Sequence, residues 1–120
     1  MATGELLDTL GMFDAAAGLP EQVEAAALSA RDLDDLPEHD DIENVVVLGM
    51  GGSGIAGDVL TTVAGPFMPV PVVAHKGYSI PNFIGDKTLV FAVSFSGNTE
   101  ETIEAVGDAA AAGGHIVAIT

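Results

Sequence analysis

The sequence predicts an α/β fold built on a parallel sheet, and two observations support this class. From Asn44 onward, short apolar runs alternate with segments that have the periodicity of helices. The apolar runs are continuous, as in parallel strands that are covered on both faces. Strands that alternate with helices and cross over right-handedly predict a doubly wound sheet. We expect the flavodoxin-like strand order 2-1-3-4-5, with the fifth strand missing and helices ahead of the first.

Residues 1–43 are expected to form an N-terminal helical segment followed by an acidic connector. Gly18 is expected to end a first helix, and Pro20 suits the start of a second helix that runs to about Ala30. The apolar side chains at helical spacing are Leu6, Leu7, Leu10 and Phe13 in the first helix and, facing inward, Val23, Ala26, Ala27 and Ala30 in the second. The acidic residues 31–43 are expected to be exposed.

Residues 44–120 are expected to form one domain with four strands. These strands are predicted at residues 45–48, 70–74, 88–93 and 115–119. The helix after the first strand is predicted from Ser53 to about Val63, ending before Gly65-Pro66, with one face formed by Ile55, Val59, Leu60 and Val63. The helix after the third strand is predicted from Thr99 to about Ala112, ending at Gly113-Gly114, with Ile103, Val106 and Ala110 inward.

Composition excludes several classes of partner. The 120-residue chain has only three cationic residues against 18 acidic ones, and its formal net charge is -15. Nucleic acids and anionic membranes both need clustered positive charge, so neither is expected as a partner. The chain has no cysteine, no apolar run long enough to span a bilayer and no signal peptide, so we expect a cytoplasmic protein.

Two polar loops follow the first and third predicted strands. Loop one is residues 49–54 (GMGGSG), and loop two is residues 94–99 (SFSGNT). Each connects a strand to a helix, where backbone N–H groups and the helix dipole favour an anion such as phosphate. Strands one and three are neighbours in the expected order, and their outgoing connections lie on opposite faces. The two loops are therefore expected side by side, around one ligand.

Loop one alone leaves two interpretations open. Its glycines satisfy the G-x-G-x-x-G pattern of dinucleotide-binding folds, but the acidic residue expected about twenty positions later is replaced by His75 and Lys76. A basic pair suits a 2′-phosphate, so a dinucleotide remains an alternative. The glycines also allow a helix to pack closely on a strand, which explains Gly57 but not Ser53. There is no G-K-[ST] sequence, which excludes a nucleotide P-loop.

Loop two favours a phosphate monoester. Ser94, Ser96 and Thr99 place three hydroxyls within six residues, more than one helix cap requires. Asn98 is expected to cap the following helix, with Glu101 completing a pair like a capping box. Hydroxyls and backbone N–H groups are neutral donors, which suits a chain with few cations.

Loop two and the residues after it, SFSGNTEET, resemble the phosphate loop of the sugar isomerase (SIS) domain family. Together with residues 49–58 (GMGGSGIAGD), they resemble its bifunctional phosphoglucose/phosphomannose isomerase branch. Residues 19–22 and 76–78 are also similar to that branch. The resemblance implies a five-stranded parallel sandwich, a phosphosugar ligand, and a homodimer of two-domain subunits of which this chain is an N-terminal part.

The resemblance also implies roles for particular residues. Ser94, Ser96 and Thr99 match the family's phosphate-binding hydroxyls. Its first substrate-binding loop matches Gly51, Gly52 and Ser53. The family's proton-transferring glutamate, ring-opening histidine and catalytic lysine lie beyond Thr120, so no catalytic residue is assigned. We expect no metal and no cofactor.

The function implied is the phosphosugar-binding part of an isomerase that interconverts glucose 6-phosphate or mannose 6-phosphate with fructose 6-phosphate. Residues 1–120 are expected to be inactive alone. The alternatives are a non-catalytic phosphosugar sensor and a dinucleotide-binding domain. The histidines His39, His75 and His115 are expected to be ordinary surface residues, and Glu100 and Glu104 are expected to complement a helix dipole.

Overall fold

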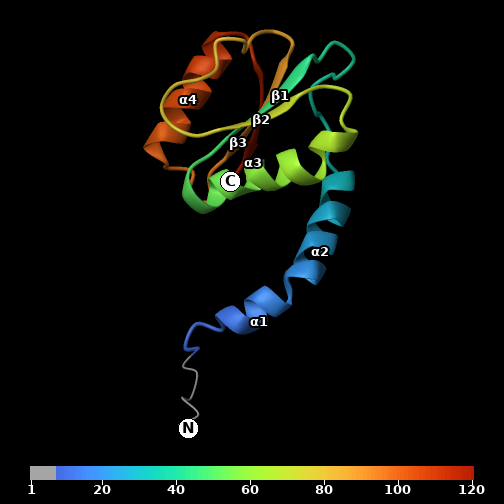
Figure 1. The fold of residues 1–120 in the computed structure, drawn as a ribbon, viewed down its shortest axis with the longest axis vertical. Coiled ribbons are helices and arrows are strands. Elements are labelled where there is room, and N and C mark those ends of the chain that lie inside the picture. The colour runs from blue at the N-terminus through green and yellow to red at the C-terminus, as the bar shows by residue number, and fades with distance from the viewer. Residues whose placement is uncertain (1–7) are drawn as a thin grey trace. The chain divides into compact units, whose positions relative to one another are not determined.

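The computed structural model describes residues 8–120 and divides the chain into two units, Met1–Asp35 and Leu36–Thr120. The first unit contains helices α1 (Met12–Ala17) and α2 (Leu19–Arg31) (Figure 1). Gly18 separates the two helices and Pro20 lies in the first turn of α2, so this part of the prediction is confirmed. The division of the chain at residues 43 and 44 stays a prediction.

The inward face predicted for α2 is wrong. Neither α1 nor α2 has a buried residue, and Val23, Ala26, Ala27 and Ala30 are all exposed. The predicted apolar stripe of the first helix also fails, since Leu10 precedes α1 and is exposed like Phe13. Leu6 and Leu7 lie outside the described residues. The pattern is amphipathic, but these helices have no sheet within their own unit against which to bury a face.

The second unit is a parallel sheet of four strands. The strands are β1 (Asn44–Leu48), β2 (Val72–His75), β3 (Thr88–Val93) and β4 (His115–Ile119). All neighbouring strands are parallel, and the order is β2-β1-β3-β4. The predicted fold class and the order of these four strands are confirmed. Only the second strand begins later than predicted, because Pro69 and Pro71 precede it.

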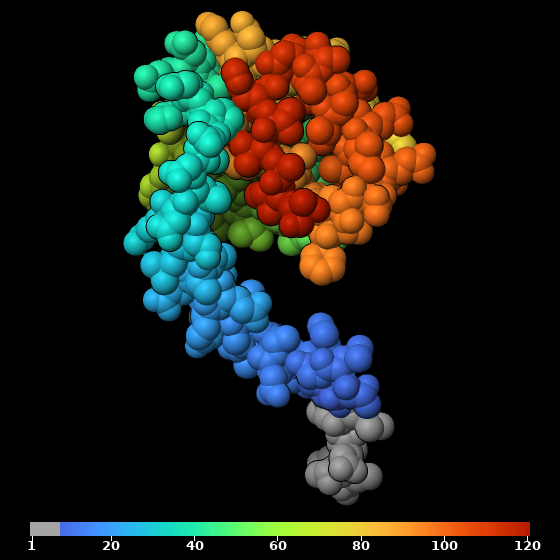
Figure 2. Space-filling view, turned by 180° about the vertical axis from the view of Figure 1, so that it is seen from behind, coloured from blue at the N-terminus to red at the C-terminus, as the bar shows by residue number. Residues whose placement is uncertain are grey.

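Helices α3 (Gly51–Val63) and α4 (Glu100–Ala111) cover opposite faces of this sheet (Figure 1). Successive side chains of a strand point to opposite faces. Val46 and Leu48 of β1 accordingly belong to the core that includes Ala105 and Ala109 of α4. A short 3-10 helix, η1 (Gly65–Phe67), follows α3. In the view from behind, β4 lies at the surface beside α4 (Figure 2), as expected for an edge strand.

The face of α4 that packs on the sheet differs from the prediction. Its buried residues are Thr102, Ala105 and Ala109, while Ile103 and Ala110 are exposed. Val106 packs against the core as predicted. Small side chains face the strands because they let the helix approach closely, and Ile80 and Ile84 from the β2–β3 connection fill the space beside α4. The helix ends at Gly113, whose φ is 96°, as predicted.

Close packing also determines the orientation of α3. Its buried residues are Gly54 and Gly57, whereas Ile55, Val59 and Val63 are more than half exposed. Of the predicted apolar face only Leu60 is half-buried, and it lines a hollow together with strand residues such as Val45 and Val47. A Cβ atom on Gly57 would lie 3.0 Å from Ala74 Cβ and 3.2 Å from Val47 Cβ. Gly57 therefore permits the contact of α3 with β1 and β2, as predicted.

Replacing Gly57 with alanine is expected to lower the free energy of unfolding by about 1–2 kcal/mol, because the added methyl overpacks this contact. Urea unfolding monitored by circular dichroism measures the change. The matched control is Gly107→Ala in α4, where a Cβ meets nothing within 4 Å. That variant is expected to be more stable by up to about 1 kcal/mol through helix propensity. Equal gains in both variants would contradict the role of Gly57.

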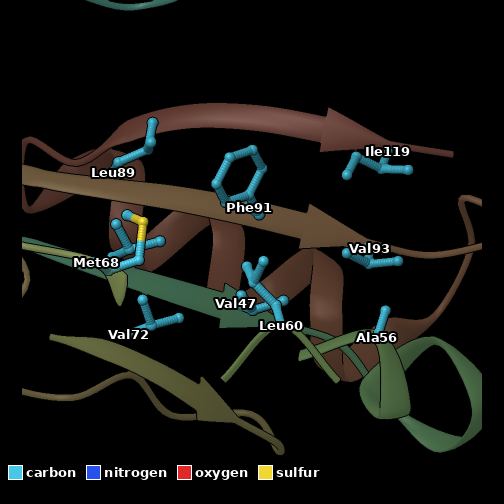
Figure 3. A pocket seen from close by; sticks show the side chains of 10 residues that line it. Val47, Ala56, Leu60, Met68, Val72, Leu89, Phe91, Val93 and Ile119 are labelled. Atoms are coloured by element: carbon cyan, nitrogen blue, oxygen red, sulfur yellow. The ribbon is translucent and has the colours of Figure 1, made fainter. Parts of the chain in front are cut away.

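The α3 face of the sheet carries an apolar hollow of about 460 Å³. It is lined by Val45, Val47, Ala56, Leu60, Met68, Val72, Leu89, Phe91, Val93 and Ile119. Figure 3 shows only carbon atoms and one methionine sulfur in these side chains.

Among the described residues, no helix is both long and apolar enough to cross a membrane.

Candidate functional site

Loops one and two lie side by side at the carboxyl ends of β1 and β3. The two strands are neighbours, and Leu48, the last residue of β1, is paired with Ala92, one residue before the end of β3. The loops are joined directly, because the backbone N–H of Phe95 donates a hydrogen bond to Ser53 Oγ at 3.3 Å. The expected juxtaposition of the two loops is confirmed.

Loop one forms the first turn of α3. The helix begins at Gly51, two residues earlier than predicted, with Met50 in the N-cap position. Gly51 has a φ of 54°, a conformation that other residues rarely adopt. No side chain of the described residues caps this helix. Its first backbone N–H groups are therefore available to a ligand near Gly51, Gly52 and Ser53.

Loop two is organised by its own hydroxyls. Ser94 is buried, and its Oγ lies 2.9 Å from Thr99 Oγ1 and accepts a hydrogen bond from the Gly97 N–H at 3.1 Å. The exposed Ser96 accepts one from the Asn98 N–H, also at 3.1 Å. Of the three predicted phosphate-binding hydroxyls, Ser96 is the most exposed. The buried Ser94 hydroxyl instead stabilises the loop through its hydrogen bonds to Thr99 and Gly97.

The predicted cap of α4 is wrong. Thr99, not Asn98, occupies the N-cap position, and no side chain of the described residues makes a capping hydrogen bond to this helix. The Thr99 hydroxyl is paired with Ser94 instead. The backbone N–H groups at the start of α4 are consequently as free of side-chain caps as those of α3. Helices α3 and α4 thus both begin at these two neighbouring loops with backbone N–H groups that no side chain caps, an arrangement that favours an anion.

The β2–β3 connection forms a third wall of the site. Strand β2 ends at His75, level with Leu48, and the next residues turn beside loop one. The Gly77 N–H donates to Met50 Sδ at 3.1 Å. On one side of this turn, Lys76 Nζ lies 2.7 Å from Asp58 Oδ2 of α3. Lys76 is not among the predicted site residues, although its position directly after a strand of this sheet is a signal for one.

Tyr78 lies on the other side of the same turn. Partial desolvation and the carboxylates of Glu100, Glu101 and Glu104 raise the pKa of its phenol above the ordinary value. These three residues are on α4, so the turn extends from one helix N-terminus to the other. A phenol with an ordinary pKa near 10 is protonated at neutral pH, and the raised pKa extends this range upward, so Tyr78 is a hydrogen-bond donor at neutral pH.

Two of the three histidines, His39 and His115, lie away from the two loops. His39 is exposed in the connector, and His115 begins β4 at the opposite end of the sheet, with Nε2 2.7 Å from the Asp86 carbonyl oxygen. His75 ends β2, one strand removed from the crevice between β1 and β3. Within the described residues, no group of three acidic, histidine or cysteine side chains is placed to hold a metal ion.

Two of the hollows in the described residues differ in chemistry. The large apolar hollow offers no hydrogen-bond donor from its side chains, and a phosphate moved there would lose its hydration without replacement. A second hollow of about 250 Å³ lies under loop two and is lined in part by Ser94, Gly97 and Thr102. The Thr102 hydroxyl is buried and has no partner among the described residues. Of these two hollows, only the one under loop two offers hydroxyl groups to a ligand.

Comparison with known families agrees with this geometry. The family model described as "SIS domain" matches residues 40–120, which include both loops and all four strands. The chain belongs to the SIS domain family. This result confirms the resemblance on which the site residues were first assigned, although their individual roles stay predictions.

Relatives of this SIS domain include named enzymes. A bifunctional phosphoglucose/phosphomannose isomerase from Caldicellulosiruptor bescii is 40% identical over 109 residues, which are 91% of this chain and 32% of the relative. A D-glucosamine-6-phosphate 4-epimerase from Sulfolobus acidocaldarius is 39% identical over 72 residues, 60% of this chain and 22% of the relative. The chain thus spans about a third or less of the length of these curated relatives.

A solved structure has the same fold as this SIS domain. The crystal structure of a candidate phosphosugar isomerase from Bacillus subtilis matches with a TM-score of 0.56 and 27% identity. The match covers 64% of this chain and 25% of that one. The α/β architecture predicted from the sequence is therefore also that of a solved structure described as a candidate phosphosugar isomerase.

Proposed function

We propose that this chain binds the phosphate of a hexose 6-phosphate as the N-terminal part of an isomerase that interconverts glucose 6-phosphate or mannose 6-phosphate with fructose 6-phosphate. The observation that carries the proposal is the pair of uncapped helix N-termini joined through Ser53 and Phe95. An anion placed between them faces two helix dipoles at once. The SIS domain match and the names of the relatives support the choice of a sugar phosphate.

Each loop has a separate role in this proposal. Ser96 and Thr99 donate hydroxyl hydrogen bonds to phosphate oxygens, together with backbone N–H groups at the start of α4. Ser94 keeps the Thr99 side chain and the Gly97 backbone in position. Gly51, Gly52 and Ser53 lie along the ligand and leave room for it, because the two glycines have no side chains and a Cβ on either would meet nothing in the protein.

The contribution of these residues to the reaction is binding energy. Isomerisation moves a proton between C2 and C1 through an enediolate, after the sugar ring opens. The phosphate at C6 does not react, so holding it orients distant carbons toward the groups that do. We propose that those acid and base groups lie outside residues 1–120, and that this chain alone has no isomerase activity.

A second candidate reaction uses the same site. The Sulfolobus acidocaldarius relative is named as a D-glucosamine-6-phosphate 4-epimerase, an enzyme whose substrate also carries a 6-phosphate. Phosphate recognition by loops one and two is common to both reactions. Incubating the longer protein that contains this chain with glucose 6-phosphate, and identifying the products, distinguishes isomerisation from epimerisation. The dinucleotide alternative has less support, because it depends on loop one alone.

The remaining proposals concern the longer protein. We propose a cytoplasmic homodimer that does not bind nucleic acid. The net charge of -15 supports the second part, and the resemblance of the chain to the sugar isomerase family implies the homodimer. We also propose residues 1–43 as a helical segment with its connector and 44–120 as the phosphosugar-binding domain. The family model begins at residue 40, which supports a boundary near the start of β1.

Glucose 6-phosphate is expected to raise the melting temperature of this chain, whereas NADPH is not. A ligand that binds the folded state stabilises it by about 2.7 kcal/mol at a concentration a hundred times Kd. Differential scanning fluorimetry with both ligands, and with unphosphorylated glucose as a control, measures the shifts. Protection by NADPH without protection by glucose 6-phosphate would favour the dinucleotide alternative and overturn the proposed function.

A further inference from the structure

Positive charges are few in the unit Leu36–Thr120, and only one of them lies near the two loops. Of the three cationic residues in the sequence, Lys76 and Lys87 belong to the unit Leu36–Thr120, all of which the structure describes. Lys87 precedes β3, at the amino end of the sheet, and pairs with Glu43 at 2.8 Å. Lys76 follows β2 and is the only Lys or Arg of this unit at the carboxyl end.

The charges around the site make this lysine important. Glu100 and Glu101 lie in the first turn of α4, and Asp58 lies on α3. A phosphate dianion bound between the loops therefore meets carboxylates as well as helix dipoles. Hydroxyls and N–H groups supply hydrogen bonds but no net charge, so a cation is needed to offset this repulsion.

The position of Lys76 allows it to supply that charge. Its side chain crosses the first turn of α3, where its Cε lies 3.0 Å from the place that a Cβ on Gly54 would occupy. Gly54 immediately follows Ser53, the residue that contacts loop two. The absence of a side chain at Gly54 therefore leaves a path for the lysine beside the N-terminus of α3.

The pairing of Lys76 with Asp58 is of a kind that a ligand can exchange. The two side chains are 45% and 52% exposed, and exposed ion pairs contribute little to stability because water and salt screen them. A phosphate dianion carries more charge than one carboxylate and has more acceptor oxygens. The ammonium can therefore leave Asp58 for the phosphate by rotation of its flexible side chain.

We propose that Lys76 is a phosphate-binding residue of this site, and that Asp58 holds it beside α3 until the ligand binds. This inference rests on the proposed function, since it assumes a phosphorylated ligand between loops one and two. It adds a residue outside both loops, and it predicts that Asp58 competes with the ligand for the ammonium group.

Lys76→Gln is expected to weaken binding of glucose 6-phosphate about tenfold at low salt, the usual scale for a charge-assisted hydrogen bond. Isothermal titration calorimetry of this chain, at two salt concentrations, measures the affinity. The variant should also lose part of the salt dependence, because one ionic contact is removed. Lys76→Arg should restore most of the affinity, which a packing role alone would not predict.

Lys87→Gln is the matched control, because it removes a lysine with a similar exposure and a similar ion pair from the opposite end of the sheet. Its affinity is expected to stay within twofold of wild type. Asp58→Asn should tighten binding two- to threefold, and this gain should disappear when Lys76→Gln is also present. Equal effects of Lys76→Gln and Lys87→Gln would overturn the proposal.

The outcome separates this inference from the proposed function. Suppose that wild type binds glucose 6-phosphate, that a variant without the loop-two hydroxyls does not, and that Lys76→Gln binds as wild type does. Only the role of Lys76 is then wrong. If wild type binds neither glucose 6-phosphate nor inorganic phosphate, the proposed function fails and the role of Lys76 fails with it.

Discussion

Replacing Ser96 and Thr99 together with alanine is expected to weaken binding of glucose 6-phosphate by about 100-fold or more. A hydrogen bond to a charged group contributes about 1.5–3 kcal/mol, and a loss of about 1.4 kcal/mol lowers affinity tenfold. Two such bonds to one phosphate therefore account for the expected loss. Isothermal titration calorimetry with glucose 6-phosphate and inorganic phosphate measures it, and both ligands should be affected alike because they share the phosphate.

The structure offers a control for this double variant. Thr61 and Thr62 of α3 also bear hydroxyls, which bond to backbone carbonyl oxygens one helical turn earlier. Replacing this pair with alanine removes the same atoms away from loop two and should leave the affinity unchanged. The loss of the Ser94–Thr99 hydrogen bond is expected to cost about 1 kcal/mol of stability. If the folded double variant bound glucose 6-phosphate as wild type does, loop two would not be the phosphate site.

Much of this fold follows from local sequence patterns. The runs that became β1, β3 and β4 are continuous and apolar, and each is bounded by polar residues or glycine. The alternation of these runs with helices left few possible topologies, and the rule for parallel sheets placed the first and third strands together. The position of both loops at one edge of the sheet was predictable for the same reason.

The helix faces were less predictable, because burial in this fold depends on close approach as well as on hydropathy. Ile103 and Ile55 are the more apolar residues of their helices, yet both are exposed while Ala105, Ala109 and Gly57 contact the strands. A periodicity analysis gives weight to large apolar residues and little to glycine or alanine. For α4 it therefore favours the face of Ile103 and Ala110 over that of the small residues that let the helix pack against the sheet.

The details of the site depended on tertiary contacts. Asn98 stands at a suitable capping position in the sequence, but Thr99 is the N-cap residue of α4. The Thr99 hydroxyl is hydrogen-bonded to Ser94 at the end of β3 and accepts no hydrogen bond from the backbone N–H groups of the helix. Lys76 is separated from Asp58 by 18 positions, and only the crossover from α3 to β2 brings them together. Sequence spacing alone gives no sign of either contact.

Replacing Gly49 with alanine is expected to lower the free energy of unfolding by about 2–3 kcal/mol, because the methyl group overpacks a rigid contact. A Cβ at this position would lie 3.0 Å from the Ser53 carbonyl oxygen and 3.1 Å from that of Val93. Both neighbours are backbone atoms, one in the first turn of α3 and one at the end of β3. Neither can move without separating loop one from loop two.

Gly52→Ala is the matched variant for this prediction, since a Cβ there meets nothing within 4 Å. Its stability should equal that of wild type or exceed it by up to about 1 kcal/mol, because alanine favours the helix. Urea unfolding compares the two variants, and calorimetry with glucose 6-phosphate compares their binding. Gly49→Ala should lose both stability and affinity, whereas Gly52→Ala should lose affinity alone, because its methyl group occupies space left for the ligand. Full affinity in Gly52→Ala would mean that the ligand does not lie along this turn of α3.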